Sequence, residues 1–373
     1  MSDLTLVLLG AGSSSRFGLG VKKQWLWIDE EPLWHFVLQR FETFADFERI
    51  LIIAPKEERP FFQAYTDKKV LAGGQSRQES IQNALEHIQT PYVLISDIAR
   101  ACIQPHVLDS LLAHKGQADC IAPFIPASDT VVYEDKAIDR SKVKLIQTPQ
   151  LSRTKVLAKA IESGEFTDES SAIKASGGSV LYIPGDPKQR KLTYKEDLKF
   201  LECLKSPAPT QRVGMGFDVH PFCQNRPLFL CGVQIEYHLG LAGHSDADVA
   251  IHALIDALLG AAGFGDIGEL FPDSDPSYKD IDSTKLLRRC VELLHQTGFV
   301  IQSVDLTIMA QVPKLLPYKE RMRNTIASIL NIPKSHCNIK ATTTEKLGFV
   351  GRQEGIAAQA VATLHYFDWS KHI

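Results

Sequence analysis

A single polar, proline-rich stretch separates two regions of this chain that differ in their pattern of apolar residues. It comprises Ser206-Pro207-Ala208-Pro209-Thr210-Gln211 and lies between segments with regular apolar spacing. Such a composition is typical of a linker. Because 373 residues exceed what one hydrophobic core comfortably holds, two domains are expected. The sequence therefore predicts domains over residues 1–205 and 212–373, joined by a linker over 206–211.

The first region alternates short apolar runs with longer amphipathic stretches. This is the βαβ rhythm of a parallel sheet. The expected strands are Leu4–Leu9, Ile50–Ala54, Tyr92–Ser96 and Cys120–Pro123, and the expected helices are Leu33–Phe44, Glu79–His87, Pro105–His114 and a closing helix at Glu196–Leu204. We therefore expect an α/β domain with a mostly parallel sheet.

The second region combines strands that carry alternating side chains with long helices. The expected helices are Asp246–Ala262, Ser283–Thr297 and Tyr318–Leu330, and two late strands are expected at Asn338–Thr343 and Ala357–Phe367. Helices and strands that do not alternate regularly are typical of an α+β domain. We found neither internal repeats nor low-complexity segments.

Charge and hydropathy exclude several classes of partner. The net charge of −3 gives no field to attract nucleic acid, so any phosphate chemistry must use local basic clusters. No run reaches the ~18 apolar residues of a membrane span. Residues Met1–Gly12 lack the basic start of a signal peptide and are better explained as a strand leading into a loop. We expect a cytoplasmic protein without nucleic-acid or membrane partners.

The number and spacing of the cysteines predict that their thiols are reduced. The chain has seven of them, an odd number, and no pair is spaced C-x-x-C. This pattern argues against both a disulfide framework and a zinc site made of thiolates. The cysteines are Cys102, Cys120, Cys203, Cys223, Cys231, Cys290 and Cys337.

The first chemical signal is the loop Gly10-Ala11-Gly12-Ser13-Ser14-Ser15-Arg16, which follows the first expected strand. Small residues allow backbone N–H groups to approach a phosphate, and a helix starting after the loop would add its positive end. Ser15 occupies the third glycine position of a dinucleotide fingerprint, and no G-K-[ST] closes a Walker loop. Arg16 and the segment Lys22-Lys23-Gln24 add the cations that a triphosphate requires. A tight turn with solvated basic residues is the alternative.

Further motifs extend this signal. They are Gly73-Gly74, Arg77, Ser80, Asp97, Ala99-Arg100, Asp129-Thr130, Asp139-Arg140, Thr148-Pro149-Gln150, Thr167-Asp168-Glu169 and Lys191-Leu192-Thr193. With the glycine loop, they make residues 1–205 resemble the 2-C-methyl-D-erythritol 4-phosphate cytidylyltransferase family. The resemblance implies a Rossmann-like nucleotidyltransferase domain that transfers CMP from CTP to 2-C-methyl-D-erythritol 4-phosphate and releases pyrophosphate. It also implies Mg²⁺ or another divalent cation on the nucleotide phosphates.

By this resemblance, Arg16 and Lys23 stabilise the transition state at the α-phosphate, and Arg140 and Lys191 hold the phosphate of the acceptor. The residues implied in binding the nucleotide or the acceptor are Gly10, Ala11, Gly12, Ser13, Ser80, Asp97, Arg100 and Thr167. Phosphoryl-type transfer needs in-line positioning and charge neutralisation rather than a protein nucleophile, so these residue types suit the reaction.

The chain departs from the family pattern in three places: Lys22 replaces a usual proline, Glu79 replaces a usual aspartate, and the segment Ser96 to Ala101 differs from the usual His-Asp-Ala-Ala-Arg-Pro at Ser96, Ile98 and Ala101. The extra methylene of Glu79 is expected to shift a ribose or metal contact by about an ångström. We expect Lys22 to be a surface cation that assists the encounter with CTP. Two alternatives stay open for this domain: a sugar-nucleotide transferase of another specificity, and a degenerate binding module.

The second region contains a candidate metal site. Asp218 and His220 are two residues apart, so in an extended strand both side chains leave the same face. His252, on an expected helix, would complete an Asp/His/His set with a fourth position open, which is the arrangement of catalytic zinc. Asp256, one turn further along, is either an orienting partner of His252 or a solvated carboxylate. Taken singly, each of these residues is more often an ordinary polar residue of the core or surface than a metal ligand. We expect that ordinary role for His238 and His295.

Around this set lie His244-Ser245, Gly265 to Gly268, Phe271-Pro272-Asp273, Ala310 to Leu316, Ala341 to Lys346 and Gly348 to Arg352. These strings make residues 212–367 resemble the 2-C-methyl-D-erythritol 2,4-cyclodiphosphate synthase family. The resemblance implies an α+β cyclodiphosphate synthase domain that forms a homotrimer or larger assembly, with active sites between subunits. Zinc would bind Asp218, His220 and His252, while His244 and Thr343 would support the transition state.

The resemblance also implies a nucleotide and diphosphate pocket. Its expected residues are Ser245, Asp266, Ile267, Gly268, Phe271, Pro272, Asp273, Ser274, Asp275, Ala310, Lys314, Leu315, Leu316, Thr342, Thr344, Glu345, Phe349 and Arg352. Gln359 replaces a glutamate often found near the trimer axis.

The implied reaction closes a ring. A phosphate on the 2-hydroxyl group attacks the β-phosphorus of a cytidine diphosphate group and expels CMP. Zinc and Mg²⁺ would neutralise the repulsion between the two anions, and enclosure would exclude water. A separate kinase must act between the two implied steps, so the fusion by itself does not indicate channelling.

Overall fold

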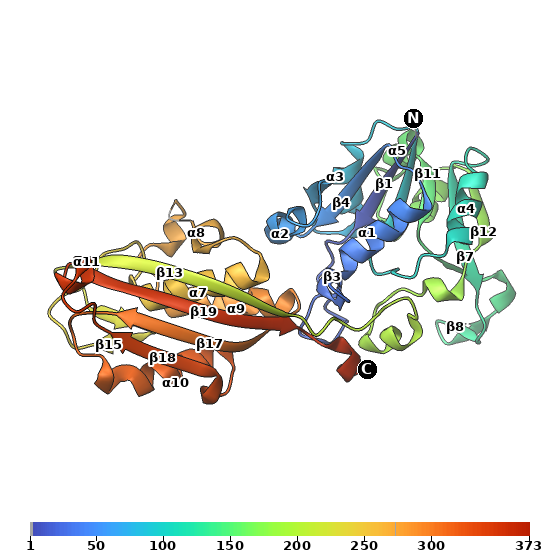
Figure 1. Ribbon diagram of the computed structural model, residues 1–373. Helices are drawn as coiled ribbons and strands as arrows, with labels where there is room; N and C mark the ends of the chain where they lie inside the picture. The colour runs from blue at the N-terminus through green and yellow to red at the C-terminus, as the bar shows by residue number, and fades with distance from the viewer. Residues whose placement is uncertain (1–2, 273) are drawn as a thin grey trace. The chain divides into compact units, whose positions relative to one another are not determined.

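The computed structural model describes residues 3–272 and 274–373. It divides the chain into two compact units (Figure 1). Unit 1 comprises Met1–Pro207 together with Asp368–Ile373, and unit 2 comprises Ala208–Phe367. No helix in the described residues is long and apolar enough to cross a membrane.

Unit 1 is built on an eight-stranded sheet with the order β10-β7-β11-β6-β1-β4-β5, in which β12 also pairs with β7. The strands are β1 (Leu4–Leu9), β4 (Arg49–Ala54), β5 (Lys69–Ala72), β6 (Tyr92–Asp97), β7 (Cys120–Pro126), β10 (Lys144–Ile146), β11 (Gln150–Arg153) and β12 (Val180–Pro184). Strand β1 runs parallel to β4 and β6, as β4 does to β5 and β12 to β7, whereas β10 and β11 are antiparallel to their neighbours. The expected α/β fold with a mostly parallel sheet is confirmed.

Helices cover both faces of this sheet, so its central strands are apolar throughout. All six residues of β1 are buried. The helices are α1 (Leu33–Phe44), α2 (Arg59–Gln63), α3 (Arg77–Leu85), α4 (Pro105–Ala113), α5 (Thr154–Ala160) and α6 (Glu169–Ala175). Short hairpins are formed by β2 (Trp27–Ile28) with β3 (Glu31–Pro32) and by β8 (Val131–Tyr133) with β9 (Lys136–Ile138). We call the β8–β9 hairpin the arm.

The closing helix expected at 196–204 is wrong. The segment forms a 3-10 turn, η5 (Lys195–Phe200), in which the Asp197 carboxylate accepts the backbone N–H groups of Thr193 and Tyr194, each at 2.9 Å. These side-chain bonds offer the backbone an alternative to helical bonds and favour a tight turn.

The expectation of reduced thiols is wrong for one pair. Cys102 and Cys203 form a disulfide, with 5.6 Å between their Cα atoms, and the other five cysteines are free. The two residues are 101 positions apart, so no short spacing announced the pairing. They meet because Cys102 follows β6 and Cys203 follows η5, two segments of the same unit.

The last six residues belong to unit 1, although the sequence predicted a second domain reaching residue 373. They include the turn η9 (Trp369–His372). Trp369 is buried and its indole Nε1 donates to the carbonyl of Trp27 at 2.8 Å. At the predicted linker, Asp29 donates its N–H to the carbonyl of Ser206 at 3.3 Å, which ties the first linker residue to unit 1.

Unit 2 contains a five-stranded sheet with the order β16-β13-β19-β17-β18. The strands are β13 (Gln211–Cys223), β16 (Gly240–Leu241), β17 (Phe299–Met309), β18 (Cys337–Thr342) and β19 (Gly355–Tyr366), with a separate hairpin of β14 (Leu228–Leu230) and β15 (Val233–Ile235). The helices are α7 (Val249–Ala262), α8 (Ile267–Leu270), α9 (Ser283–Gln296), α10 (Lys319–Leu330) and α11 (Gly348–Gly351). Only β17 and β18 pair in parallel among the described strands of this sheet, so the α+β expectation is confirmed.

Strand β13 packs unusually closely against α7. A Cβ atom on Gly214 would lie 2.1 Å from the carbonyl oxygen of Ala257, and one on Gly216 would lie 2.0 Å from that of Ala253. Only glycine fits at these two positions. The close approach brings the later residues of β13 beside the side chains of α7.

Candidate functional sites

A cavity of about 540 Å³ in unit 1 opens where β1 ends. Its lining includes nine residues expected from the sequence: Gly10, Ala11, Gly12, Ser13, Arg16, Lys23, Ser80, Asp97 and Lys191. The glycine pair before α3 approaches the loop closely, since a Cβ atom on Gly73 would lie 2.3 Å from that of Ala11. The loop, the start of α3 and the end of β6 thus form one concave surface.

The expected helix after the glycine loop is absent from the described chain. The loop leads instead to the 3-10 turn η1 (Lys23–Trp25). Lys23 donates its N–H to Ser14 Oγ at 3.0 Å, and its Nζ donates to the carbonyl of Leu192 at 3.2 Å. Burial, and then the charges of Lys191 and Arg16, lower the pKa of Lys23. The cations of the glycine loop and of η1 therefore contribute to the positive potential of the cavity as side chains, and the helix end at the cavity is that of α3.

Asp97 is the anionic centre of this cavity. Its carboxylate accepts from Arg77 Nε at 3.2 Å and from Lys191 Nζ at 2.5 Å. Burial alone would raise its pKa, but Arg77 and Lys191 together lower the pKa of Asp97 to about 2. Asp97 is therefore ionised at neutral pH.

Arg77 connects this centre to α6. Its NH1 atom donates to Glu169 Oε1 at 2.7 Å and to the carbonyl of Thr167 at 3.5 Å. Glu169 is buried, and that burial raises the pKa of its carboxyl group. Neither Arg77 nor Glu169 was among the expected site residues, although both lie within the motifs that carried the resemblance. The signal available was their place in those motifs, since Arg77 lies three residues before Ser80 and Glu169 two residues after Thr167.

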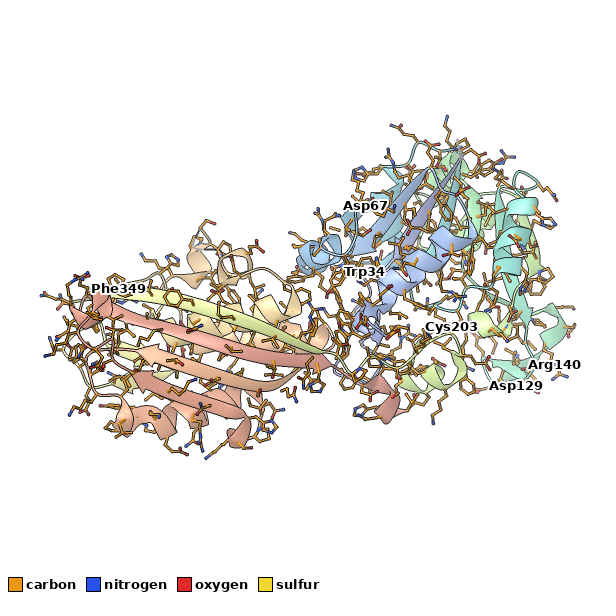
Figure 2. The ribbon with its side chains drawn as sticks, in the orientation of Figure 1. Trp34, Asp67, Asp129, Arg140, Cys203 and Phe349 are labelled. Atoms are coloured by element: carbon orange, nitrogen blue, oxygen red, sulfur yellow. A yellow bond between two sulfur atoms is a disulfide. The ribbon has the colours of Figure 1, made fainter. Side chains whose placement is uncertain are left out.

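Three expected residues do not line the cavity. The guanidinium of Arg100 donates to the carbonyls of Gln189 at 2.6 Å and Ile146 at 3.2 Å, and burial lowers its pKa to about 10. Thr167 contributes only its backbone carbonyl group, which accepts from Arg77 NH1 at 3.5 Å. Arg140 is exposed near the arm, where it donates to the carbonyl of Ser128 at 2.7 Å (Figure 2).

Two of the departures from the family pattern have structural roles. Lys22 forms an ion pair with the buried carboxylate of Glu58, so the expectation of a solvated surface cation is wrong. Glu79 accepts the N–H of Gln75 at 2.6 Å, while Ser76 caps α3 by accepting the N–H of Glu79 at 3.0 Å. Glu79 therefore stabilises the turn that leads into α3.

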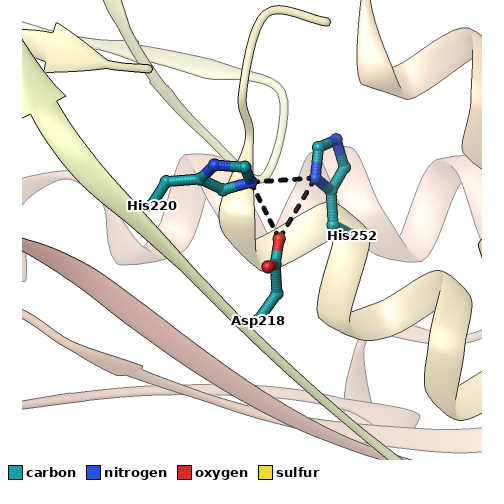
Figure 3. Close-up of side chains that lie close together, drawn as sticks. All are labelled: Asp218, His220 and His252. Atoms are coloured by element: carbon teal, nitrogen blue, oxygen red, sulfur yellow. Dashed lines mark hydrogen bonds and ion pairs between the residues drawn. The ribbon is translucent and has the colours of Figure 1, made fainter. Parts of the chain in front are cut away.

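In unit 2, the structure brings Asp218, His220 and His252 together (Figure 3). His220 Nε2 lies 2.9 Å from Asp218 Oδ2, and His252 Nδ1 lies 3.1 Å from the same oxygen. The two histidine nitrogens are 3.2 Å apart. Although burial opposes ionisation, the two histidine side chains beside its carboxylate hold the pKa of Asp218 well below its usual value.

Partners behind the histidines orient both rings. His220 Nδ1 lies 2.7 Å from the carbonyl of Ala242; because a carbonyl only accepts, Nδ1 carries the proton and Nε2 presents its lone pair to the cluster. His252 Nε2 lies 3.0 Å from Ser245 Oγ and 3.1 Å from Ser283 Oγ. Ser283 was not expected from the sequence. Two imidazole nitrogens and one carboxylate oxygen fit a divalent metal of the zinc class.

Asp256 does not orient His252 by a hydrogen bond. Its carboxylate accepts the N–H of Ile267 at 2.8 Å and so fixes the start of α8. Burial raises the pKa of Asp256. Of the two alternatives considered from the sequence, neither the orienting partner nor the solvated carboxylate describes it.

The expected pocket residues of unit 2 form separate groups. At the ends of β17 and β18, Ala310 donates its N–H to the carbonyl of Thr342 at 3.0 Å, which brings the 310–316 and 342–346 segments together. Thr343 is exposed and its hydroxyl donates to Glu345 at 2.8 Å. His244 is half-buried, and its Nε2 has no hydrogen-bond partner among the described residues. Asp273 lies outside the described residues.

The remaining expected pocket residues differ in exposure. Phe271 and Leu315 are buried, whereas Leu316 is 78% exposed and Phe349, at the start of α11, is 38% exposed (Figure 2). Asp266 caps α8 by accepting the N–H of Glu269 at 2.9 Å. Arg352 pairs with Glu354 at 2.7 Å. Exposed apolar side chains beside a polar loop are typical of a surface that contacts a ligand or a partner.

The fold and the two sites are those of a fused enzyme: a nucleotidyltransferase-like unit with a cavity lined by cations, followed by a unit whose Asp/His/His cluster could hold a metal ion. Family models match both halves, namely 2-C-methyl-D-erythritol 4-phosphate cytidylyltransferase over residues 4–205 and the YgbB family over 211–365. The chain belongs to the bifunctional IspD/IspF enzymes.

Curated relatives and a solved structure support this assignment. The bifunctional enzyme IspD/IspF of a Nitratiruptor species is 62% identical over 372 residues, covering 100% of both chains. That of Sulfurimonas denitrificans is 52% identical over 372 residues, covering 100% of this chain and 96% of the relative. The bifunctional IspDF structure from Campylobacter jejuni matches with a TM-score of 0.88 and 44% identity, covering 99% of this chain and 100% of that chain.

The chain is therefore a bifunctional enzyme of isoprenoid-precursor synthesis by the methylerythritol phosphate route. Its first domain transfers CMP from CTP to 2-C-methyl-D-erythritol 4-phosphate. Its second domain converts 4-diphosphocytidyl-2-C-methyl-D-erythritol 2-phosphate to 2-C-methyl-D-erythritol 2,4-cyclodiphosphate and releases CMP.

Proposed function

We propose that cytidylyl transfer takes place in the cavity at the end of β1, where the glycine loop binds the CTP phosphates. Arg16 and Lys23 stabilise the charge that develops as pyrophosphate leaves. The observation that carries this proposal is the convergence of Arg16, Lys23 and Lys191 on one cavity. Mg²⁺ or another divalent cation on the nucleotide phosphates supplies further charge neutralisation.

The acceptor is held beside Asp97. Lys191 is paired with Asp97 and lines the same cavity, so its charge is available to an acceptor phosphate bound there. Asp97 itself is ionised and bonded to two cations, which suits a role in binding the acceptor's hydroxyl groups. Thr167, Arg100 and Arg140 belong to this proposal on the family resemblance, and Ser80 on its place in the cavity lining.

In unit 2, Asp218, His220 and His252 hold a zinc ion, which supplies polarisation of a substrate phosphate when bound. The tautomer of His220 and the serine partners of His252 support this assignment. His244 and Thr343 stabilise the transition state, and the expected pocket residues bind the cytidine diphosphate group. A divalent cation of the Mg²⁺ type accompanies the diphosphate.

A homotrimer formed by unit 2 is also part of the proposal. Alternate residues of β13 point away from α7, and these are apolar and exposed: Val213 at 64%, Met215 at 64%, Phe217 at 53% and Val219 at 43%. A row of this kind supports burial against other copies of the chain. Sedimentation or light scattering on the purified protein tests the stoichiometry. The cytoplasm remains the predicted location.

A combined assay tests the two chemical assignments on one sample. Phosphorus NMR of the purified protein with CTP, Mg²⁺ and methylerythritol phosphate should show pyrophosphate and the cytidine diphosphate product. Metal analysis of the same sample should then give one zinc per chain. Absence of pyrophosphate would reject the first assignment, and iron or no metal at the triad would reject the second.

A further inference from the structure

A buried carboxylate lies directly behind the phosphate loop of unit 1. The side chain of Glu58, in the 3-10 turn η2 (Lys56–Glu58), is only 5% exposed. It accepts from Lys22 Nζ, from Trp25 Nε1 at 2.7 Å and from Gln24 Nε2 at 3.5 Å. These three donors surround Lys23 in the sequence. One carboxylate therefore fixes the turn η1 from the side that faces away from the cavity.

The same turn is fixed from the cavity side by the glycine loop. Gln24 Nε2 also lies 3.4 Å from the carbonyl of Gly12, and Ser14 Oγ donates to Gln24 Oε1 at 3.2 Å. Ser14 Oγ in turn accepts the N–H of Lys23 at 3.0 Å. Gln24 thus joins Glu58 to the loop that contacts the nucleotide.

The charge of Glu58 requires a partner, because a buried carboxylate without one is strongly destabilising. Lys22 supplies it. The backbone of Lys22 has φ −72°, a value that most residues adopt, so the lysine is not needed for the conformation of the chain. Its side chain matters because it neutralises Glu58.

We propose that Glu58 is a positioning residue for cytidylyl transfer and that Lys22 is its counter-charge. Together they hold η1 so that the ammonium group of Lys23 points into the cavity. This inference rests on the proposed role of Lys23. It replaces the interpretation of Lys22 as a cation that attracts CTP from solution.

The test compares Lys22→Met, Glu58→Gln and the double variant in the full-length chain, with CTP turnover measured as pyrophosphate release. Each single variant should lower kcat about 10-fold to 100-fold, the range expected when a charged group is displaced by an ångström. The KM for CTP should change less than about twofold, and the loss should persist at high salt. The double variant should recover most of the lost kcat, because it removes both charges together.

Two exposed neighbours provide matched controls, Lys56→Met and Glu57→Gln, which should leave kcat unchanged. Cyclodiphosphate formation by unit 2 should be unchanged in every variant, which shows that unit 2 is intact, and tryptophan fluorescence checks that unit 1 is folded, because all four tryptophans belong to it. If Glu58→Gln alone is insoluble, the comparison of Lys22→Met with the double variant still measures the recovery.

A higher KM for CTP with unchanged kcat in Lys22→Met, disappearing at high salt, would overturn the inference in favour of substrate attraction. Additive losses in the double variant would overturn it too. The variant Lys23→Ala distinguishes a wrong positioning role of Lys22 and Glu58 from a wrong catalytic role of Lys23. Full activity in Lys23→Ala rejects the role of Lys23 itself, whereas an inactive Lys23→Ala beside a fully active Lys22→Met rejects only the positioning pair.

Discussion

Cations in the first cavity differ in what they bond to, and this difference separates their roles. Lys191 and Arg77 both donate to the carboxylate of Asp97. Lys23 donates to a carbonyl group, and its pKa is lowered by burial and by the neighbouring cations. The repulsion between Lys23 and the neighbouring Lys191 and Arg16 falls when an anion binds between them. Lys23 is therefore the residue best suited to a developing phosphate charge.

The first prediction concerns this charge. Lys23→Ala should lower kcat for pyrophosphate release by about 10²–10³, the usual loss for one preorganised electrostatic contact. Lys56→Ala, at an exposed position of the same unit, is the matched control. A loss below about threefold would show that Lys23 does not act on the transition state.

The second prediction concerns the buried ion pair of Arg77 with Glu169. Arg77→Met leaves the Glu169 carboxylate buried without its cation, so the free energy of unfolding of unit 1 should fall by roughly 3–5 kcal/mol. All four tryptophans, Trp25, Trp27, Trp34 and Trp369, belong to unit 1, so urea unfolding followed by tryptophan fluorescence reports this unit. Adding Glu169→Gln should restore part of the loss. No recovery would mean that Arg77 acts mainly through Asp97.

The third prediction concerns the metal. His252→Ala should remove the ion and abolish CMP release from the phosphorylated substrate, because two ligands do not hold zinc well. Cytidylyl transfer should persist. His238→Ala, at an exposed histidine, is the control. Stoichiometric zinc in His252→Ala would contradict the ligand assignment.

The contact between β13 and α7 holds the three ligands together. The strand supplies Asp218 and His220, and the helix supplies His252. Glycine at position 216 lets the strand approach the helix backbone. The separation of the ligands therefore depends on a residue that binds nothing itself.

The fourth prediction follows from this contact. Gly216→Ala places a methyl group against the carbonyl of Ala253 and should push β13 away, lowering zinc affinity at least about tenfold through misplaced ligands. Gly260→Ala is the matched control, since a Cβ atom there meets nothing within 4 Å and alanine favours the helix. Competition with a zinc chelator measures both variants. Equal affinities would show that the strand adjusts without moving its ligands.

Most elements could be predicted from local sequence, since β1 and α1 carry their apolar periodicity within a few residues. The triad could also be predicted, because Asp218 and His220 share a face of one strand. Ser283 could not be, because it reaches His252 only through tertiary folding. The same applies to Glu58, which lies 36 positions from Lys22, and to the disulfide. Local bonds made by Asp197 outweighed helix propensity in η5, so that helix prediction was wrong.

Two interactions within unit 1 connect parts of the chain that are distant in the sequence. One is the disulfide between Cys102 and Cys203. The other is the hydrogen bond from the buried Trp369 to the backbone carbonyl of Trp27. Both connect segments that the apolar periodicity of either half would not have joined.

The fifth prediction concerns the disulfide. Thiol titration of the denatured, unreduced protein should give five free thiols, and seven after reduction. Reduction should lower the free energy of unfolding of unit 1 by about 2–4 kcal/mol, because the bond closes a long loop. Cys223→Ser should lower both thiol counts by one and leave the stability difference intact. Seven thiols before reduction would show that the pair is reduced in the purified enzyme.

The C-terminal turn has a consequence for how the enzyme is made. Ribosomes deliver a chain from its first residue onward, and early domains begin to fold before later ones exist. Here Trp369, which donates to the carbonyl of Trp27, emerges only after all of unit 2 has been synthesised. The first unit therefore reaches its final packing last. A chain that ends before residue 369 lacks this hydrogen bond and the buried indole that makes it.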